Sequence, residues 1–354
     1  MSHSFHNNLM RYTMELHITR FGTKIAVKDG MFELSWFDDN QTLQKESHSP
    51  LKIKSLWVQD GTVITVAAHL LALQHGIDLA LLDQHGMPQA RMYGFELHTT
   101  PSVQKAQVIV SVGPHAVTFV KHWTAAKLQN QSDFLEKLRS RRDRQKQELL
   151  HERSEEILKL RKQIQALDGK KVKEVAETLR GLEGAAGQLF FQTLSDVLPE
   201  EYRFEGRSRM PARDPFNAFL NYGLAILYGK TELALLLAGV NPYIGFLHRD
   251  GYRLKSMVFD FIEPFRIWVE RVVFRLFSRK IVTATHTEAY DGGLHLNVAG
   301  KKLLAESLKE YLDEKKEEAD GNVVSREQFL RFSAMKFGKR LLQIAQMESE
   351  EPVA

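Results

Sequence analysis

The feature that most constrains the fold is a change of hydrophobic pattern near residues 95–102. Before it, short segments alternate apolar and polar residues and are separated by turn dipeptides such as Asp29-Gly30 and Asp60-Gly61, which is typical of β-strands and hairpins. One segment there, "TVAAHLLALQHG", has helical spacing and a stop at Gly76. Beyond Pro101, apolar residues recur at helical spacing through long charged stretches. The pattern predicts an α+β fold, with a β-rich N-terminal domain followed by a mostly α-helical C-terminal domain.

The same change sets the expected domain boundaries in a chain of 354 residues, which is long enough for two domains. We expect, in order, a disordered extension, a β-rich domain, a linker, a helical domain and a frayed tail, at residues 1–14, 15–95, 96–101, 102–340 and 341–354. The basic run "KLRSRRDRQKQELLHERSEEILKLRK" in the helical part is typical of a solvated helix face, with DNA contact as the alternative.

Composition narrows the classes of function. The chain has no cysteine, so disulfide frameworks and thiolate zinc sites are excluded, and a reducing, cytoplasmic location agrees with this. No run approaches the roughly 20 apolar residues of a membrane span, and the N-terminal stretch lacks the apolar region of a signal peptide. The net charge of +4 and the pI of about 9.0 favour anionic partners such as nucleic acid.

One candidate acid, Glu183, lies on a predicted helix. Leu179, Ala186 and Phe190 share its face, so the carboxylate stands within an apolar stripe. Residues 184–187 are all Gly or Ala, and two glycines inside a helix each cost about 1 kcal/mol against alanine. Such small residues let a ligand or another backbone approach the acid. The alternative is a structural Glu at a tight helix crossing, paired with an arginine.

Three further candidates lie close together in the chain. His248 ends a short apolar run, and Asp260 and Glu263 lie in another, just before Pro264. In a helix the two acids would face the same way. Taken singly, Glu263 is also explained as a helix cap and His248 as a core histidine. Together with Glu183 they form a donor set of carboxylates and one imidazole, which suits Mg²⁺ or Mn²⁺ better than zinc. Such an ion can activate water or a 3′-hydroxyl and neutralise charge on a phosphate, so a metal-dependent enzyme is one interpretation of the helical domain.

Two other histidines, His286 and His295 in "THTEAYDGGLHLN", are weaker candidates for ligands. A surface loop and a helix cap explain them better.

Four segments together carry a resemblance to a known family. They are "LRGLEGAAGQLFF", "RSRMPARDPFNAFLNYGLAILYG", "LLLAGVNPYIGFLHRD" and "MVFDFIEPFR". In order and spacing they resemble the universal CRISPR-associated endonuclease and integrase of spacer acquisition, the Cas-one family. A fifth segment, "LLALQHGIDLALLDQHGMPQARM", is similar to the strand region before the family's linker. The resemblance runs from about residue 15 to residue 340.

The resemblance implies an organisation and an activity. It implies a homodimer formed through the β-rich domains. Two such homodimers would flank one Cas-two dimer. It implies capture of a short double-stranded DNA, the protospacer, and its insertion into the CRISPR repeat by 3′-hydroxyl attack on a phosphodiester. The family also acts as a metal-dependent DNA endonuclease.

The resemblance also assigns residues. Glu183, His248 and Glu263 would be the ligands of Mg²⁺ or Mn²⁺, and Asp260 would support them or serve as an alternate ligand. Arg266 would contact DNA phosphate. For Asn217 and Tyr222, in the segment that leads into the helical core, packing and DNA contact are equally good explanations, so neither is assigned to the site.

Three other functions compete with this one. A non-catalytic DNA-binding scaffold of the same fold is disfavoured because every acid is present. A hydrolase of small phosphoesters would need a closed pocket, whereas long basic helices dominate this chain. A structural helical protein explains each residue singly but not the four segments together.

Overall fold

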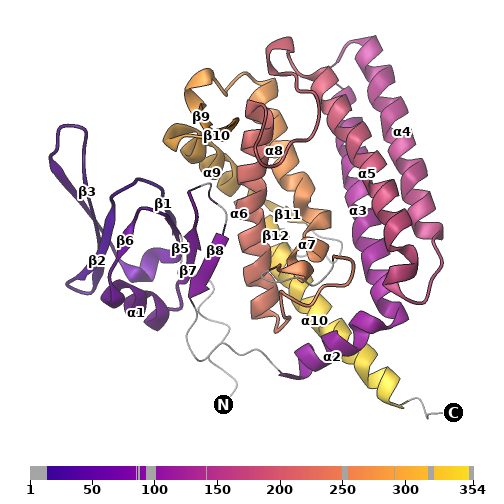
Figure 1. Ribbon diagram of the computed structural model, residues 1–354, viewed down its shortest axis with the longest axis horizontal. Coiled ribbons are helices and arrows are strands. Elements are labelled where there is room, and N and C mark those ends of the chain that lie inside the picture. Colours follow the sequence, from indigo (N-terminus) through magenta and orange to yellow (C-terminus); the bar gives the residue numbers. More distant parts are fainter. Residues whose placement is uncertain are drawn as a thin grey trace. The chain divides into compact units, whose positions relative to one another are not determined.

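Two units make up the computed structural model (Figure 1). It describes residues 14–84, 86, 88–92, 101–140, 142–248, 254–290, 292–317 and 323–350. Residues 1–97 form the first unit and residues 98–354 the second. Of the expected extension only Met14 is described, and it begins a strand. Most of the expected linker lies outside the described residues, and its last residue, Pro101, begins a helix.

The first unit contains two four-stranded sheets. One has the order β4-β3-β2-β6 and the other the order β1-β5-β7-β8. In chain order the strands are β1 (Met14–Ile18), β2 (Lys24–Lys28), β3 (Met31–Phe37), β4 (Leu43–His48), β5 (Ile53–Gln59), β6 (Val63–Ile64), β7 (Asp78–Leu82) and β8 (Pro88–Met92).

The turn chemistry of the sequence explains the first hairpin of this unit. Strands β2 and β3 pair antiparallel, from Lys28 opposite Met31. The two residues between them, Asp29 and Gly30, have φ of 50° and 70°, the left-handed pair that a tight hairpin turn requires. Helix α1 (Val66–Gln74) begins at Thr65, whose hydroxyl accepts the Ala68 amide. One apolar cluster joins both sheets and this helix.

The second unit is mostly helical. Its α-helices are α2 (Pro101–Val112), α3 (Pro114–Arg139), α4 (Arg144–Ala166), α5 (Val172–Val197), α6 (Pro215–Leu237), α7 (Ser256–Phe261), α8 (Arg266–Ser278), α9 (Val298–Asp313) and α10 (Arg326–Glu350). Helices α3, α4 and α5 run side by side in Figure 1 and pack against one another. The expected fold class, β-rich then α-helical, is confirmed.

Local sequence explains where the long helices begin. Gly113 and Pro114 separate α2 from α3, because proline fits the first turn of a helix and lacks the amide that a helix interior needs. The carboxylate of Asp143 caps α4 by accepting the Lys146 amide. Likewise Asp214 accepts the Asn217 amide at the start of α6.

The second unit differs from the expectation in two places. It contains two short hairpins, β9 (Thr287–Tyr290) with β10 (Gly293–Leu296) and β11 (Lys315–Glu317) with β12 (Val323–Ser325). Helix α10 also continues past residue 340, where fraying was expected. Leu341 and Ile344 are buried in the core, and their packing holds this last stretch in the helix.

Among the described residues, no helix is both long enough and apolar enough to span a bilayer.

Candidate metal centre

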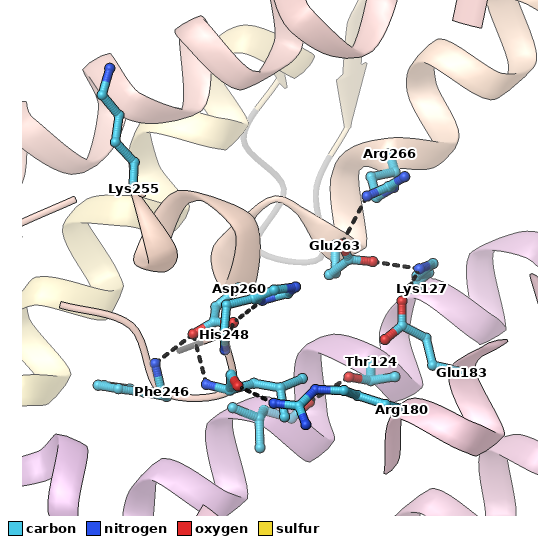
Figure 2. A network of polar contacts seen from close by, with 12 residues as sticks. Thr124, Lys127, Arg180, Glu183, Phe246, His248, Lys255, Asp260, Glu263 and Arg266 are labelled. Atoms are coloured by element: carbon cyan, nitrogen blue, oxygen red, sulfur yellow. Dashed lines mark hydrogen bonds and ion pairs between the residues drawn. The ribbon is translucent and has the colours of Figure 1, made fainter. Parts of the chain in front are cut away.

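The predicted site residues lie on different elements of the second unit that meet in one place (Figure 2). Glu183 lies in the middle of α5 and His248 ends the segment after α6. Asp260 belongs to α7. Glu263 begins the short 3₁₀ helix η3 (Glu263–Phe265), and Arg266 begins α8.

A lysine that the sequence analysis did not single out joins two of the acids. The ammonium of Lys127, on α3, lies 2.5 Å from Oε1 of Glu183 and 2.6 Å from Oε2 of Glu263. The side chain of Lys127 is 10% exposed, that of Glu263 7% and that of Glu183 23%. Figure 2 shows the ammonium between the two carboxylates. Both acids therefore direct an oxygen at one cationic centre.

Glu263 has a second cationic partner. Nη1 of Arg266 donates to its Oε1 at 3.0 Å. Burial alone would raise the pKa of Glu263, but the charges of Arg266 and Lys127 outweigh it and lower that pKa to about 2. Burial likewise opposes the charge on Lys127, yet Glu263 and Glu183 together raise its pKa. Glu263, Lys127 and Arg266 are therefore charged at neutral pH.

Asp260 makes a different set of contacts and holds the segment that carries His248. Its carboxylate accepts the backbone amides of Phe246, Leu247 and His248 at 2.5, 2.9 and 3.1 Å. It also lies 2.6 Å from Nδ1 of His248. A carboxylate only accepts, so Nδ1 carries the proton, and Nε2 is left for another partner. This is the carboxylate–histidine pairing that orients metal-binding imidazoles.

The imidazole of His248 is the most accessible of these groups, with 42% of its side chain exposed. Burial tends to lower the pKa of His248, but the hydrogen bond and charge of Asp260, with weaker help from Glu263 and Glu183, raise it. From α5, Nη2 of Arg180 donates to the carbonyl of Leu247 at 2.8 Å. The histidine is thus held by α7 on one side and by α5 on the other.

Behind the lysine lies a second polar layer, where α3 crosses α8. Gln131 is one turn beyond Lys127, and Glu270 one turn beyond Arg266; both are fully buried. A weak hydrogen bond from Gln131 reaches the carboxylate of Glu270, and neither Oε2 of Glu270 nor the Gln131 amide has a further partner among the described residues. Burial raises the pKa of Glu270, and the charges of Arg266 and Lys127 offset this only in part.

The small residues beside Glu183 leave open space. A Cβ atom added at Gly181, Gly184 or Gly187 would meet no atom within 4 Å. None of the described residues therefore packs closely against these glycines, although Glu183 itself is paired with a basic residue, Lys127, much as the structural alternative expected of an arginine. The carboxylate keeps an approach route along the helix.

One expectation about the other candidates needs revision, and one stays a prediction. Asp260 and Glu263 do not belong to one helix, because α7 ends at Phe261 and Glu263 begins the 3₁₀ helix η3. Arg266 directs one guanidinium nitrogen at Glu263 and is 17% exposed, so its role at DNA stays a prediction.

Asn217 and Tyr222 both lie in α6 and make packing contacts there. Asn217 is fully buried and bonded to Asp214, Gly206 and Arg207. Tyr222 is buried, and burial raises its pKa to about 12.

The two weaker candidate histidines, His286 and His295, make local contacts. Nδ1 of His286 accepts the amide of Thr283, as in a helix cap. Nε2 of His295 lies 3.0 Å from Glu288 across the β9–β10 hairpin.

A sequence signal for Lys127 existed. The buried positions of α3 include Val120, Trp123, Lys127, Gln131 and Phe134, at spacings of three, four, four and three. A lysine at a core position of a helix indicates a candidate site, just as Glu183 does in the apolar stripe of α5.

The donor chemistry fits a divalent metal. Two carboxylates already converge on one cation, the Lys127 ammonium, and an imidazole whose Nε2 has no partner among the described residues lies nearby. Such hard oxygens with one nitrogen suit Mg²⁺ or Mn²⁺. Within the described part of the chain, however, no three His, Cys, Asp or Glu side chains are close enough to hold an ion as they stand, since Lys127 separates Glu183 from Glu263.

Comparison with known proteins identifies relatives over most of the chain. The family model described as "CRISPR associated protein Cas1" matches residues 16–310. A protein of Archaeoglobus fulgidus named "CRISPR-associated endonuclease Cas1 1" is 32% identical over 316 residues, 85% of this chain and 89% of that protein.

Solved structures share the fold. A structure described as "Casposase bound to integration product" has a TM-score of 0.79 at 20% identity, covering 95% of this chain and 91% of that one. A Cas1 protein from Thermotoga maritima has a TM-score of 0.75 at 18% identity, covering 93% and 97%. A "Cas6-RT-Cas1--Cas2 complex" matches at 0.75 and 19% identity, with 94% of this chain and 35% of that one. The resemblance inferred from the four sequence segments is confirmed, and the chain belongs to the CRISPR-associated protein Cas1 family.

Proposed function

We propose that this protein is a divalent-metal-dependent DNA endonuclease and integrase of CRISPR adaptation. Its reaction would be the insertion of captured short DNA duplexes as new spacers, by attack of a 3′-hydroxyl on a repeat phosphodiester. The observation that carries the proposal is the convergence of Glu183 and Glu263 on one cationic centre beside the oriented imidazole of His248. Membership of a family whose relatives are named endonucleases supports it.

The metal ligands in this proposal are Glu183, Glu263 and Nε2 of His248, and the ion is Mg²⁺ or Mn²⁺. When bound, the ion would orient the attacking oxygen and neutralise charge on the phosphate. Asp260 has a supporting role: all its described contacts are to the segment 246–248, so it fixes the direction in which Nε2 points.

The remaining residues of the site would bind and position DNA. In-line displacement at phosphorus depends mainly on positioning and charge neutralisation. The open face of α5 at Gly184 and Gly187 gives a phosphodiester access to Glu183. The guanidinium of Arg266 bonds Glu263 through one nitrogen, which leaves donors to contact a phosphate oxygen. Binding through phosphate contacts weakens as salt rises, so affinity for duplex DNA should fall between low and moderate salt.

The names of relatives support the Cas2 and DNA partners, and the homodimer is an expectation from the sequence resemblance. A solved relative is described as a Cas1–Cas2 complex and another as a casposase bound to an integration product. We expect this chain to form a homodimer through its β-rich unit, to assemble with a Cas2 dimer, and to act in the cytoplasm on double-stranded protospacer and repeat DNA.

A strand-transfer assay tests the proposal. Purified protein and its Cas2 partner are mixed with a short duplex and a supercoiled CRISPR plasmid, in Mg²⁺, Mn²⁺ or EDTA. Glu183→Ala and His248→Ala are compared with Glu177→Ala and His122→Ala, exposed residues of α5 and α3.

Joining in Mg²⁺ or Mn²⁺ that EDTA and both site variants abolish, while the control variants retain it, is the expected result. Joining that survives EDTA or either site variant would refute the site. DNA binding without joining by any of the proteins would favour a non-catalytic scaffold.

A further inference from the structure

The metal centre contains a cation of its own. Lys127 contacts Oε1 of Glu183 and Oε2 of Glu263, the oxygens that face each other across the site. Carboxylate oxygens bind Mg²⁺ at about 2.0–2.1 Å, and an ammonium at 2.5 and 2.6 Å from the same oxygens uses the same lone pairs. A divalent ion and this ammonium repel each other, so they compete for these oxygens.

Lys127 has neighbours that can receive it. Gln131 lies one turn along α3 from the lysine, and Glu270 lies on α8, which packs against α3. Both are fully buried; Gln131 makes a weak hydrogen bond to Glu270, and Oε2 of Glu270 and Oε1 of Gln131 have no further partner among the described residues. The charge of Lys127 already acts on Glu270. A buried acceptor left unpaired is costly, and an arriving ammonium would satisfy it.

We propose that Lys127 has two positions and that divalent metal binding is coupled to its transfer between them. In one it bridges Glu183 and Glu263; in the other it binds Glu270 and Gln131, and the two carboxylates are free to ligate the ion. Lys127 is then a positioning residue that lowers metal affinity, and Glu270 is the group that limits this competition. The inference rests on the metal centre of the proposed function.

A double-mutant cycle on Mn²⁺ affinity tests the transfer. Free Mn²⁺ is measured by electron paramagnetic resonance during titration of the full-length protein and of Lys127→Met, Glu270→Met and the double variant. Methionine nearly conserves the volume of both side chains, so packing is retained. Circular dichroism confirms that each variant is folded.

Opposite effects of the two single variants are expected. Lys127→Met should bind Mn²⁺ at least about tenfold more tightly, because the competing cation is gone. Glu270→Met should weaken binding about fivefold when Lys127 is present, because the lysine has lost its second position, and by less than about twofold when it is added to Lys127→Met. Structural damage weakens ligand binding and does not tighten it, so the gain in Lys127→Met separates competition from a packing role.

Two results would overturn this inference and leave the proposed function standing. In the first, Lys127→Met binds Mn²⁺ no more tightly than wild type. In the second, Glu270→Met changes the Mn²⁺ affinity equally with and without Lys127. Glu183→Gln and His248→Ala serve as reference variants. If those two bind Mn²⁺ as well as wild type does, the metal centre of the proposed function fails as well, and the two failures are distinguishable.

Discussion

Replacing Lys127 by methionine should destabilise the metal-free protein, and Mn²⁺ should reverse most of the loss. The ammonium is the shared partner of two carboxylates at 2.5 and 2.6 Å, and one of these, Glu263, is buried. Without the ammonium, the carboxylates of Glu183 and Glu263 repel each other. Arg266, which is 3.0 Å from Glu263, is then the cation that still contacts this pair.

The magnitude follows from burial. Removing one partner of a buried ion pair costs about 3–5 kcal/mol. Glu183 is 23% exposed, so solvent screens part of its share, and Arg266 compensates Glu263. The lower end, about 3 kcal/mol, is therefore expected. At roughly 2–4 °C per kcal/mol for a domain of this size, the melting temperature in EDTA should fall by about 6–12 °C.

The assay is thermal unfolding of the full-length variant followed by circular dichroism in the far ultraviolet, in EDTA and in excess Mn²⁺. Lys137→Met, at an exposed position of the same helix, is the matched control and should change the melting temperature by no more than about 1 °C. The expectation is refuted if Lys127→Met and wild type have the same melting temperature in EDTA. It is also refuted if Mn²⁺ raises the melting temperature of the variant less than that of wild type.

Three further variants test the surrounding contacts. Asp260→Asn should lower the pKa of His248, because Asp260 raises it, and weaken Mn²⁺ binding about 10–100-fold; an unchanged NMR titration of His248 would contradict this. Glu263→Gln should remove part of the acid sensitivity: the pKa of Glu263 is lowered from 4.5 to about 2, so wild type gains about 3 kcal/mol that is present above pH 4.5 and lost as the pH falls towards 2. Equal slopes of unfolding free energy against pH in the two proteins would exclude that contribution. Arg180→Met should cost about 1 kcal/mol through loss of the bond to the Leu247 carbonyl and weaken Mn²⁺ binding severalfold, whereas an unchanged affinity would show that this bond does not position the histidine.

Local pattern was enough to predict much of the fold. The left-handed Asp29-Gly30 pair and the helical spacing of α1 are encoded in neighbouring residues. The hairpins β9–β10 and β11–β12 were missed because each strand has only three or four residues, too few to establish an alternation. The end of α10 was missed because its polar sequence conceals the burial of Leu341 and Ile344.

The site was predictable as a set of residues but not as an arrangement. Glu183 stood out because it interrupts an apolar stripe, and His248, Asp260 and Glu263 because they adjoin apolar runs. The different contacts of Asp260 and Glu263 depend on the 3₁₀ turn after α7, which their spacing does not reveal. The place of Lys127 depends on contacts from α3 to Glu183 and Glu263, far along the chain, and only tertiary packing brings these together.

The most direct test of the metal centre is a crystal structure of the protein soaked in Mn²⁺, with anomalous diffraction measured at the manganese edge. We predict one strong peak within bonding distance of Glu183, Glu263 and Nε2 of His248, with Asp260 still on Nδ1 and the Lys127 ammonium moved towards Glu270. A manganese peak away from these three side chains, or none in crystals that hold Mn²⁺ elsewhere, would contradict it.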